Sequence, residues 1–171
     1  METAAQNEPG AANSSTTAER ASDREFVVTR TFNGPARVVF DAWAKPELFR
    51  RWWTPKSFGM TIMSCEMDVR TGGSYRLLIA HPSMPEPMAF FGRYLDVVEP
   101  SRIVWTNDEG GEDQGAVTTV TFEERDGRTL VILRDRYPSK EALDEAMVSG
   151  ATSGFDEQFA QLDELLTAAG N

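Results

Sequence analysis

The sequence predicts an α+β domain in which one curved antiparallel sheet is covered by a long C-terminal helix. Three observations support this prediction. Segments of alternating apolar and polar residues follow one another with short turns between them, which favours antiparallel neighbours over strand–helix–strand units. Two short helical patterns come directly after the first strand. One long amphipathic pattern ends the chain, and it is the element available to cover the apolar face of the sheet.

The first strand is predicted at residues 25–32, where the sequence EFVVTRTF presents one mostly apolar face. Asn-Gly-Pro at 33–35 ends this strand, and Pro35 suits the first turn of a helix. The following segment, 36–43, places apolar side chains at helical spacing. A short helix is therefore expected directly after the first strand.

A second short helix is predicted from Pro46, in the stretch that contains the sequence LFRRWWTP. At about 100° per residue, the four large apolar side chains of this stretch share one arc and the two arginines lie on the other side. These apolar residues are Leu48, Phe49, Trp52 and Trp53. The prediction is an amphipathic helix of about two turns. Helical spacing then accounts for the Arg-Trp adjacency without a cation–π contact.

The middle of the chain predicts a run of further strands joined by short connections. These segments are 59–69, 74–81, 88–99, 102–107, 116–125 and 128–136. Asp-Gly at 126–127 is the strongest hairpin signal among them. Together with the first strand, the pattern predicts a sheet of about six to seven strands.

The C-terminal part is predicted to be helical in two pieces, with glycines between them. The second piece, from Phe155, places Phe159, Leu162 and Leu166 on one face and acidic residues on the other. A single helix laid into a curled sheet rarely fills it completely. A cavity between the sheet and this helix is therefore expected.

The composition excludes several classes of function. The chain has 27 acidic and 17 basic residues, a net charge of −10, which argues against nucleic-acid binding and against docking on anionic membranes. Its one cysteine excludes an internal disulfide framework and a cysteine-rich metal site. No stretch reaches the roughly 18 apolar residues of a membrane span.

The N-terminal segment differs in composition from the rest of the chain. Residues 1–22 have no bulky apolar residue after Met1, so they cannot bury enough surface to offset the entropy of ordering. We expect a disordered tail at 1–22 and one folded domain at 23–171. The segment lacks the basic start and apolar middle of a secretory signal, which predicts a cytoplasmic protein.

Four stretches taken in order resemble one known superfamily. They are TRTFNGPARVVFDAWAKPELFRRWWTP (29–55), DVRTGGSYR (68–76), FGRYLDVVEPSRIVWT (91–106) and SGFDEQFAQLDELL (153–166). The chain is similar over about residues 24–168 to the START-like, helix-grip (SRPBCC) superfamily. Within it, the chain resembles the family named after the activator of the heat-shock-protein-90 ATPase. Two features differ from that pattern: Gly154-Phe155 replaces the usual Gly-Trp, and the loop at 81–87 is rich in proline.

The resemblance implies a helix-grip fold with a hydrophobic pocket for a small apolar ligand. Strand alternation and helical spacing then select the candidate ligand-binding residues. These are Trp52, Trp53, Phe58, Met60, Tyr75, Leu77, Phe91, Tyr94, Trp105, Phe122, Phe155, Phe159 and Leu162. Plain core packing is the alternative interpretation for each of them.

No catalytic set, metal site or cofactor is predicted. The one histidine, His81, lies beside a proline at a strand end and is interpreted as a solvated loop residue. The acidic loop at 107–115 lacks the spacing of a calcium-binding loop, so a solvated hairpin loop is the simpler interpretation.

Three functional hypotheses follow, because a fold does not specify a function. The first is non-enzymatic binding of a small hydrophobic molecule. The second is an interaction module with a protein partner, either a chaperone-ATPase activator or a stress-response regulator, as the resemblance implies. The third is a cyclase-like or hydrolase-like enzyme that acts on a hydrophobic substrate. The sequence leaves open whether the chain is a monomer or a homodimer.

Overall fold

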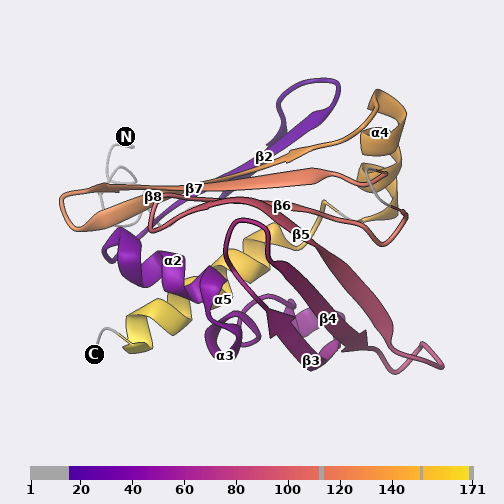
Figure 1. Cartoon of the computed structure of the whole chain (residues 1–171), viewed down its shortest axis with the longest axis horizontal. Coiled ribbons are helices and arrows are strands. Elements are labelled where there is room, and N and C mark those ends of the chain that lie inside the picture. Colours follow the sequence, from indigo (N-terminus) through magenta and orange to yellow (C-terminus); the bar gives the residue numbers. More distant parts are fainter. Residues whose placement is uncertain (1–15, 112–113, 151, 170–171) are drawn as a thin grey trace, which may run out of the picture.

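A computed structural model describes residues 16–111, 114–150 and 152–169, which form one antiparallel sheet and several helices, with the C-terminal helix inside the curve of the sheet (Figure 1). Along the sheet the strand order is β1-β2-β8-β7-β6-β5-β4-β3. The strands are β1 (Thr17–Arg20), β2 (Glu25–Phe32), β3 (Thr61–Met67), β4 (Ser74–Ala80), β5 (Met88–Val98), β6 (Arg102–Thr106), β7 (Val117–Arg125) and β8 (Arg128–Arg136). The predicted fold class is confirmed.

Short helices follow the first long strand and helices end the described chain, as the sequence predicts. They are α2 (Ala36–Ala44), α3 (Pro46–Phe49), the 3₁₀ turn η2 (Lys56–Phe58), α4 (Lys140–Ser149) and α5 (Phe155–Ala169). The Ser139 side chain caps α4 by accepting a hydrogen bond of 3.0 Å from the backbone N–H of Ala142. In the described part of the chain, no helix combines the length and apolar character needed to cross a membrane.

A row of apolar side chains crosses the inner face of the sheet. Val28 of β2 pairs with Leu133 of β8, which pairs with Val120 of β7, which pairs with Ile103 of β6. All four are at most 1% exposed. Burial of each such side chain stabilises the fold by about 1.5–3 kcal/mol, so this row fixes the register of the central strands.

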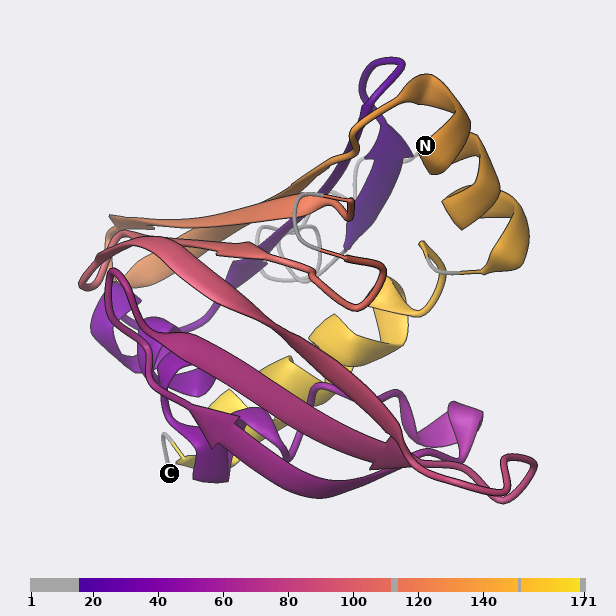
Figure 2. The same ribbon diagram turned by 45° about the vertical axis from the view of Figure 1, so that its right-hand side comes forward.

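Helix α5 crosses the inside of the curved sheet and lies beside α2 and α3 (Figure 2). Phe159 and Leu162 of α5 are fully buried. Phe159 meets Trp43 of α2 with ring centroids 5.9 Å apart, and Trp43 meets Trp52 at 4.6 Å, both edge to face. These contacts form an aromatic core at one end of the fold.

The segment predicted to be a disordered tail includes a strand. Thr17–Arg20 form an eighth strand, β1, which pairs with the edge of β2 from Thr17 opposite Thr29 to Arg20 opposite Phe26. The prediction of disorder up to residue 22 is wrong for this strand, because an edge strand needs backbone partners and few apolar side chains. Residues 1–15, which the same prediction covers, lie outside the described residues.

The predicted two-turn helix at the Arg-Arg-Trp-Trp stretch is also shorter than expected. Helix α3 ends at Phe49. The chain continues in turns, where the N–H of Trp52 bonds to the carbonyl of Phe49 at 3.2 Å. The arginines and the tryptophans still lie on opposite sides of this segment, as predicted. Both arginines are exposed and Trp52 is fully buried. Arg50 donates to the carbonyl of Ile62 at 3.0 Å.

Candidate functional site

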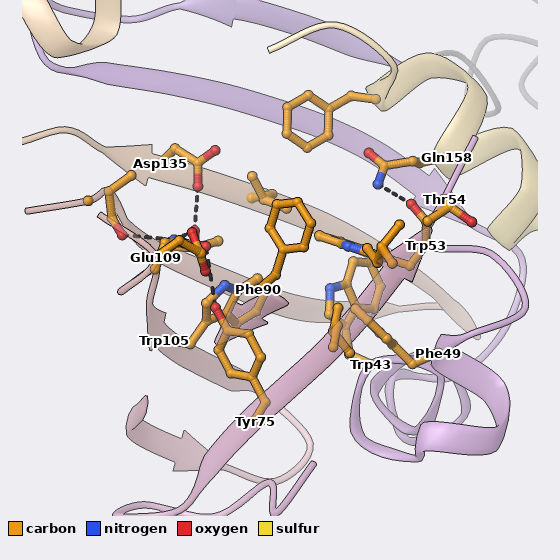
Figure 3. Close-up of a pocket in the computed structure, with 18 of the residues that line it drawn as sticks. Trp43, Phe49, Trp53, Thr54, Tyr75, Phe90, Trp105, Glu109, Asp135 and Gln158 are labelled. Atoms are coloured by element: carbon orange, nitrogen blue, oxygen red, sulfur yellow. Dashed lines mark hydrogen bonds between the residues drawn. The ribbon is translucent and has the colours of Figure 1, made fainter. Parts of the chain in front are cut away.

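A cavity of about 500 Å³ lies between the inner face of the sheet, the segment at 53–60 and the start of α5. Figure 3 shows Trp43, Phe49 and Trp53 at one end of it and Asp135 with Glu109 at the other. Most of the described lining side chains are apolar or aromatic. The cavity is therefore an apolar chamber with a polar end.

The sheet forms the floor of this cavity through strand alternation. Tyr75, Leu77 and Ile79 of β4 line the cavity, and so does a second row on β6 and the residue after it, Ile103, Trp105 and Asn107. In each row the side chains are two residues apart and so lie on one face.

A close backbone approach beneath this floor depends on a glycine. A Cβ at Gly92 of β5 would lie 2.0 Å from the carbonyl oxygen of Thr106 and 2.9 Å from the ring of Tyr75. The Tyr75 hydroxyl donates to that same carbonyl at 2.8 Å. Burial raises the pKa of Tyr75 well above its usual range. Tyr75 therefore stays neutral, as a fixed part of the floor.

Two glutamines of α5 hold the opposite wall in place. Gln161 donates to the carbonyls of Trp52 at 3.1 Å and Thr54 at 3.0 Å, and its Oε1 accepts from the N–H of Lys56 at 2.8 Å. Gln158, which lines the cavity, donates to the carbonyl of Trp53. The irregular backbone at 52–56 thus finds its hydrogen-bond partners on α5, as a buried loop must.

The start of α5 approaches this wall closely through Gly154. This residue has φ +94°, and a Cβ there would lie 3.1 Å from the ring of Phe58 and 3.3 Å from Pro55. Phe58 is 39% exposed and lines the cavity. Glu109, Gly110 and Ser153 also line the cavity and are exposed. These exposed lining residues place the mouth between the 107–111 segment, η2 and the link from α4 to α5.

The polar end of the cavity contains a hydrogen-bonded chain on β7, β8 and the end of β6. Asn107 donates through Nδ2 to the Thr118 hydroxyl oxygen at 3.2 Å, and the Thr118 hydroxyl bonds to Oδ1 of Asp135 at 2.5 Å. Burial raises the pKa of Asp135 to about 6, against a smaller lowering by the Thr118 hydrogen bond. Asp135 is half-buried, and it lines the cavity.

At the mouth, Glu109 is the second carboxyl group that lines the cavity. Its Oε2 accepts a hydrogen bond of 2.9 Å from the N–H of Phe91. Partial burial raises its pKa, against a lowering by that hydrogen bond. The two carboxyl groups of the described lining, those of Asp135 and Glu109, therefore lie toward the same end of the cavity (Figure 3).

The structure brings eight of the thirteen predicted residues together on the cavity wall. They are Trp53, Phe58, Met60, Tyr75, Leu77, Tyr94, Trp105 and Phe155. Strand alternation placed Tyr75, Leu77 and Trp105, and helical spacing placed Phe155, whereas Trp53, Phe58 and Met60 lie in the segment before β3. Whether they bind a ligand remains a proposal.

The other five residues do not line this cavity. Trp52, Phe122, Phe159 and Leu162 are at most 3% exposed and pack in the core behind the wall. Strand alternation for Phe122 and helical spacing for the others identify a buried face but cannot separate a core contact from a cavity contact. Phe91 is 39% exposed and faces outward, because the inward positions of β5 are Phe90, Gly92 and Tyr94.

Sequence reasoning missed the polar end of the cavity. Asp135 follows Thr129, Val131 and Leu133 at a spacing of two, and all of these face inward. This alternation could have predicted that the Asp135 carboxylate points toward the inside of the sheet. Thr118 is likewise at an inward position of β7. Gln158 carried no comparable signal, because it is a helix residue between apolar neighbours.

The comparisons with known proteins agree with this architecture. A protein from Mycobacterium smegmatis has 26% identity and a TM-score of 0.75, and the match covers 90% of this chain and 99% of that one. A Rhodobacter sphaeroides protein is 20% identical with a TM-score of 0.79, covering 90% and 98%. An AHSA1-like protein from Aeromonas hydrophila is 18% identical with a TM-score of 0.64, covering 84% and 94%. The last two likenesses show the fold alone.

No curated protein matches the chain. The family model described as Activator of Hsp90 ATPase homolog 1-like protein matches residues 33–167, which include both short helices, β3 to β8 and most of α5. The chain therefore belongs to the Activator of Hsp90 ATPase homolog 1-like family.

Proposed function

We propose that this domain binds a small hydrophobic molecule in the cavity between its sheet and α5. The observation that carries the proposal is the cavity itself, about 500 Å³ in volume and lined mostly by apolar and aromatic side chains. Small-molecule sites have volumes of about 300–1,000 Å³ and a similar lining with a few polar groups.

An unfilled space of this size is not ordinary core packing. Protein interiors are close-packed, with few voids larger than a water molecule. Here the wall is held open by hydrogen bonds from Gln158 and Gln161 to the backbone at 52–56. Exposed lining residues at the mouth give a route from solvent. A wall fixed by hydrogen bonds and an entrance from solvent both favour a cavity that binds a small molecule.

The test uses a neutral apolar dye, Nile red, with two neighbouring leucines of β4 as a matched pair. Leu77 lines the cavity and is 3% exposed, whereas Leu78 lies on the other face of the strand. Leu77→Trp should fill part of the cavity and weaken dye binding at least about tenfold, which corresponds to about 1.4 kcal/mol. Leu78→Trp should bind the dye as the wild type does. Ile79→Phe offers a smaller filling change if Leu77→Trp does not fold.

Native mass spectrometry of the purified protein provides an independent measurement. A bound mass that is lost on denaturation would show a co-purified ligand, and Leu77→Trp should reduce its occupancy. Equal dye binding by folded Leu77→Trp and Leu78→Trp variants would contradict the cavity proposal. It would favour the second hypothesis, an interaction module that uses its outer surface.

One observation favours catalysis as a second candidate. Asp135 has a pKa raised to about 6 by burial, a value suited to acid–base catalysis near neutral pH. Thr118, whose hydroxyl bonds to Asp135, lines the cavity but is only 4% exposed, so little of it is accessible to a substrate. Ligand binding consequently ranks first. Turnover of a neutral ester that Asp135→Asn abolishes would reverse this order.

A further inference from the structure

The polar end of the cavity contains a carboxylate that no positively charged side chain among the described residues meets. Asp135 occupies an inward position of β8, and within the described residues the Thr118 hydroxyl is the one donor that reaches its carboxyl group. Burial raises its pKa to about 6, so the group is ionised at neutral pH and above. An ionised carboxylate in an apolar chamber is costly unless a cation or further donors meet it.

The described lining of the cavity offers no such cation. Among those residues there is no lysine, arginine or histidine. The strand neighbours of Asp135, Arg134 and Arg136, are exposed on the other face of β8, where Arg134 is 3.5 Å from Glu25. The described residues thus leave the negative charge of Asp135 uncompensated on the cavity side.

The other titratable groups around Asp135 add no positive charge. Tyr75 of β4, Tyr137 after β8 and Glu109 at the mouth line the same cavity. The charge of Asp135 raises the pKa of both tyrosines, in addition to the larger effect of burial. The start of α5 and its preceding link contribute Gly150, Ser153, Phe155 and Gln158 to the lining, none of which titrates near neutral pH.

The remaining wall suits the apolar part of a cationic ligand. Trp53, Trp105, Phe90 and Phe155 contribute aromatic rings to the lining. Aromatic faces attract organic cations, most strongly where water is excluded. The net charge of −10 over the whole chain also favours the approach of cations over anions.

We propose that the cavity selects a lipophilic amine, with its protonated nitrogen against Asp135 and its apolar body against the aromatic wall. This inference rests on the proposed function and narrows the class of ligand. A ligand carboxylate would instead add a further negative charge beside Asp135 and Glu109. A neutral ligand would leave the charge of Asp135 unpaired and buried more deeply.

Three probes with one apolar body test this selection: 2-naphthylmethylamine, 2-naphthylmethanol and 2-naphthoic acid, titrated calorimetrically at pH 7.5. The amine should bind at least about tenfold more tightly than the alcohol, and the acid should bind most weakly. Lowering the pH through about 6 protonates Asp135, so the affinity for the amine should fall. The affinity for the alcohol should stay level or rise.

Asp135→Asn should remove the preference for the amine and leave alcohol binding intact. Asp126→Asn makes the same change of net charge in the β7–β8 turn, where φ is +58°, a conformation that asparagine tolerates. This control should keep the preference. Both comparisons separate a local carboxylate effect from the overall charge of the chain.

The outcomes distinguish this inference from the proposed function. Equal affinities for amine and alcohol in the wild type, or a preference that survives Asp135→Asn, would overturn the cation inference while leaving a cavity that binds hydrophobic molecules. Failure of all three probes and of Nile red to bind would overturn both.

Discussion

Replacing Asp135 with asparagine should stabilise the unliganded protein at neutral pH, and less so at acid pH. The side chain lies on the inward face of β8 with one hydrogen-bond donor, Thr118, 2.5 Å from Oδ1. Asparagine has the same shape and can accept the same hydrogen bond through its amide oxygen. The substitution therefore removes the buried charge and keeps the contact.

The magnitude follows from the pKa of Asp135. Burial raises this pKa from 3.8 to about 6, which corresponds to about 3 kcal/mol of destabilisation once the carboxyl is ionised in both states. Between pH 4 and 6 the unfolded chain loses this proton before the folded protein does, so the free energy of unfolding falls as pH rises. Above about pH 6 to 7 the penalty is complete. Asp135→Asn should gain about 3 kcal/mol at pH 8 and about 1 kcal/mol at pH 4.5.

Urea unfolding at pH 8 and pH 4.5 measures both values, provided that the slope against urea concentration does not change. Asp144→Asn is the control, because Asp144 bonds to Lys140 at 3.0 Å and Arg20 at 2.6 Å, which lower its pKa. Neutralising that exposed carboxylate should not stabilise the protein. Gains from Asp135→Asn that agree within about 0.5 kcal/mol at the two pH values, a spread typical of surface changes, would refute the reasoning.

Two further predictions concern the walls of the cavity. Gln161→Met should destabilise the protein by about 1–3 kcal/mol in urea unfolding, because buried backbone groups at 52–56 lose their partner; an unchanged midpoint would mean that water replaces the glutamine. Gly92→Ala should cost about 3 kcal/mol or more, since its Cβ would lie 2.0 Å from the Thr106 carbonyl oxygen. Gly110→Ala, with nothing within 4 Å of the new Cβ, should be near neutral, and similar melting temperatures for the two variants would contradict this account.

The strand pattern predicted more of the site than the helical pattern did. A strand side chain points to one face of the sheet or to the other. Alternation therefore placed Tyr75 and Leu77 on the cavity wall once the inner face of the sheet was known. A helix such as α5 meets different neighbours at each turn. Phe155 lines the cavity while Phe159, one turn later, is fully enclosed by the core. Periodicity alone gives both residues the same environment.

The tail and the tryptophan pair show what local patterns leave undecided. Thr17–Arg20 have no apolar signal, and their order comes from the free edge of β2. Trp52 and Trp53 are neighbours in sequence, yet Trp52 is fully buried with its Nε1 donating to the Ala42 carbonyl at 3.0 Å, whereas Trp53 lines the cavity. Both outcomes depend on partners outside the segment itself.

Asp135 illustrates how an inconsistency in a sequence can indicate function. The segment LVILRDR continues the period of two from Leu133 to an inward position that packing alone would give to an apolar residue. A carboxylate there opposes both the hydrophobic pattern and the stability of the unliganded fold. Proteins break such local rules mainly where function requires it. A bound cation would lower the pKa of Asp135 and offset this cost, so the stabilisation by a bound amine should rise with pH across the range in which the stability of the unliganded protein falls.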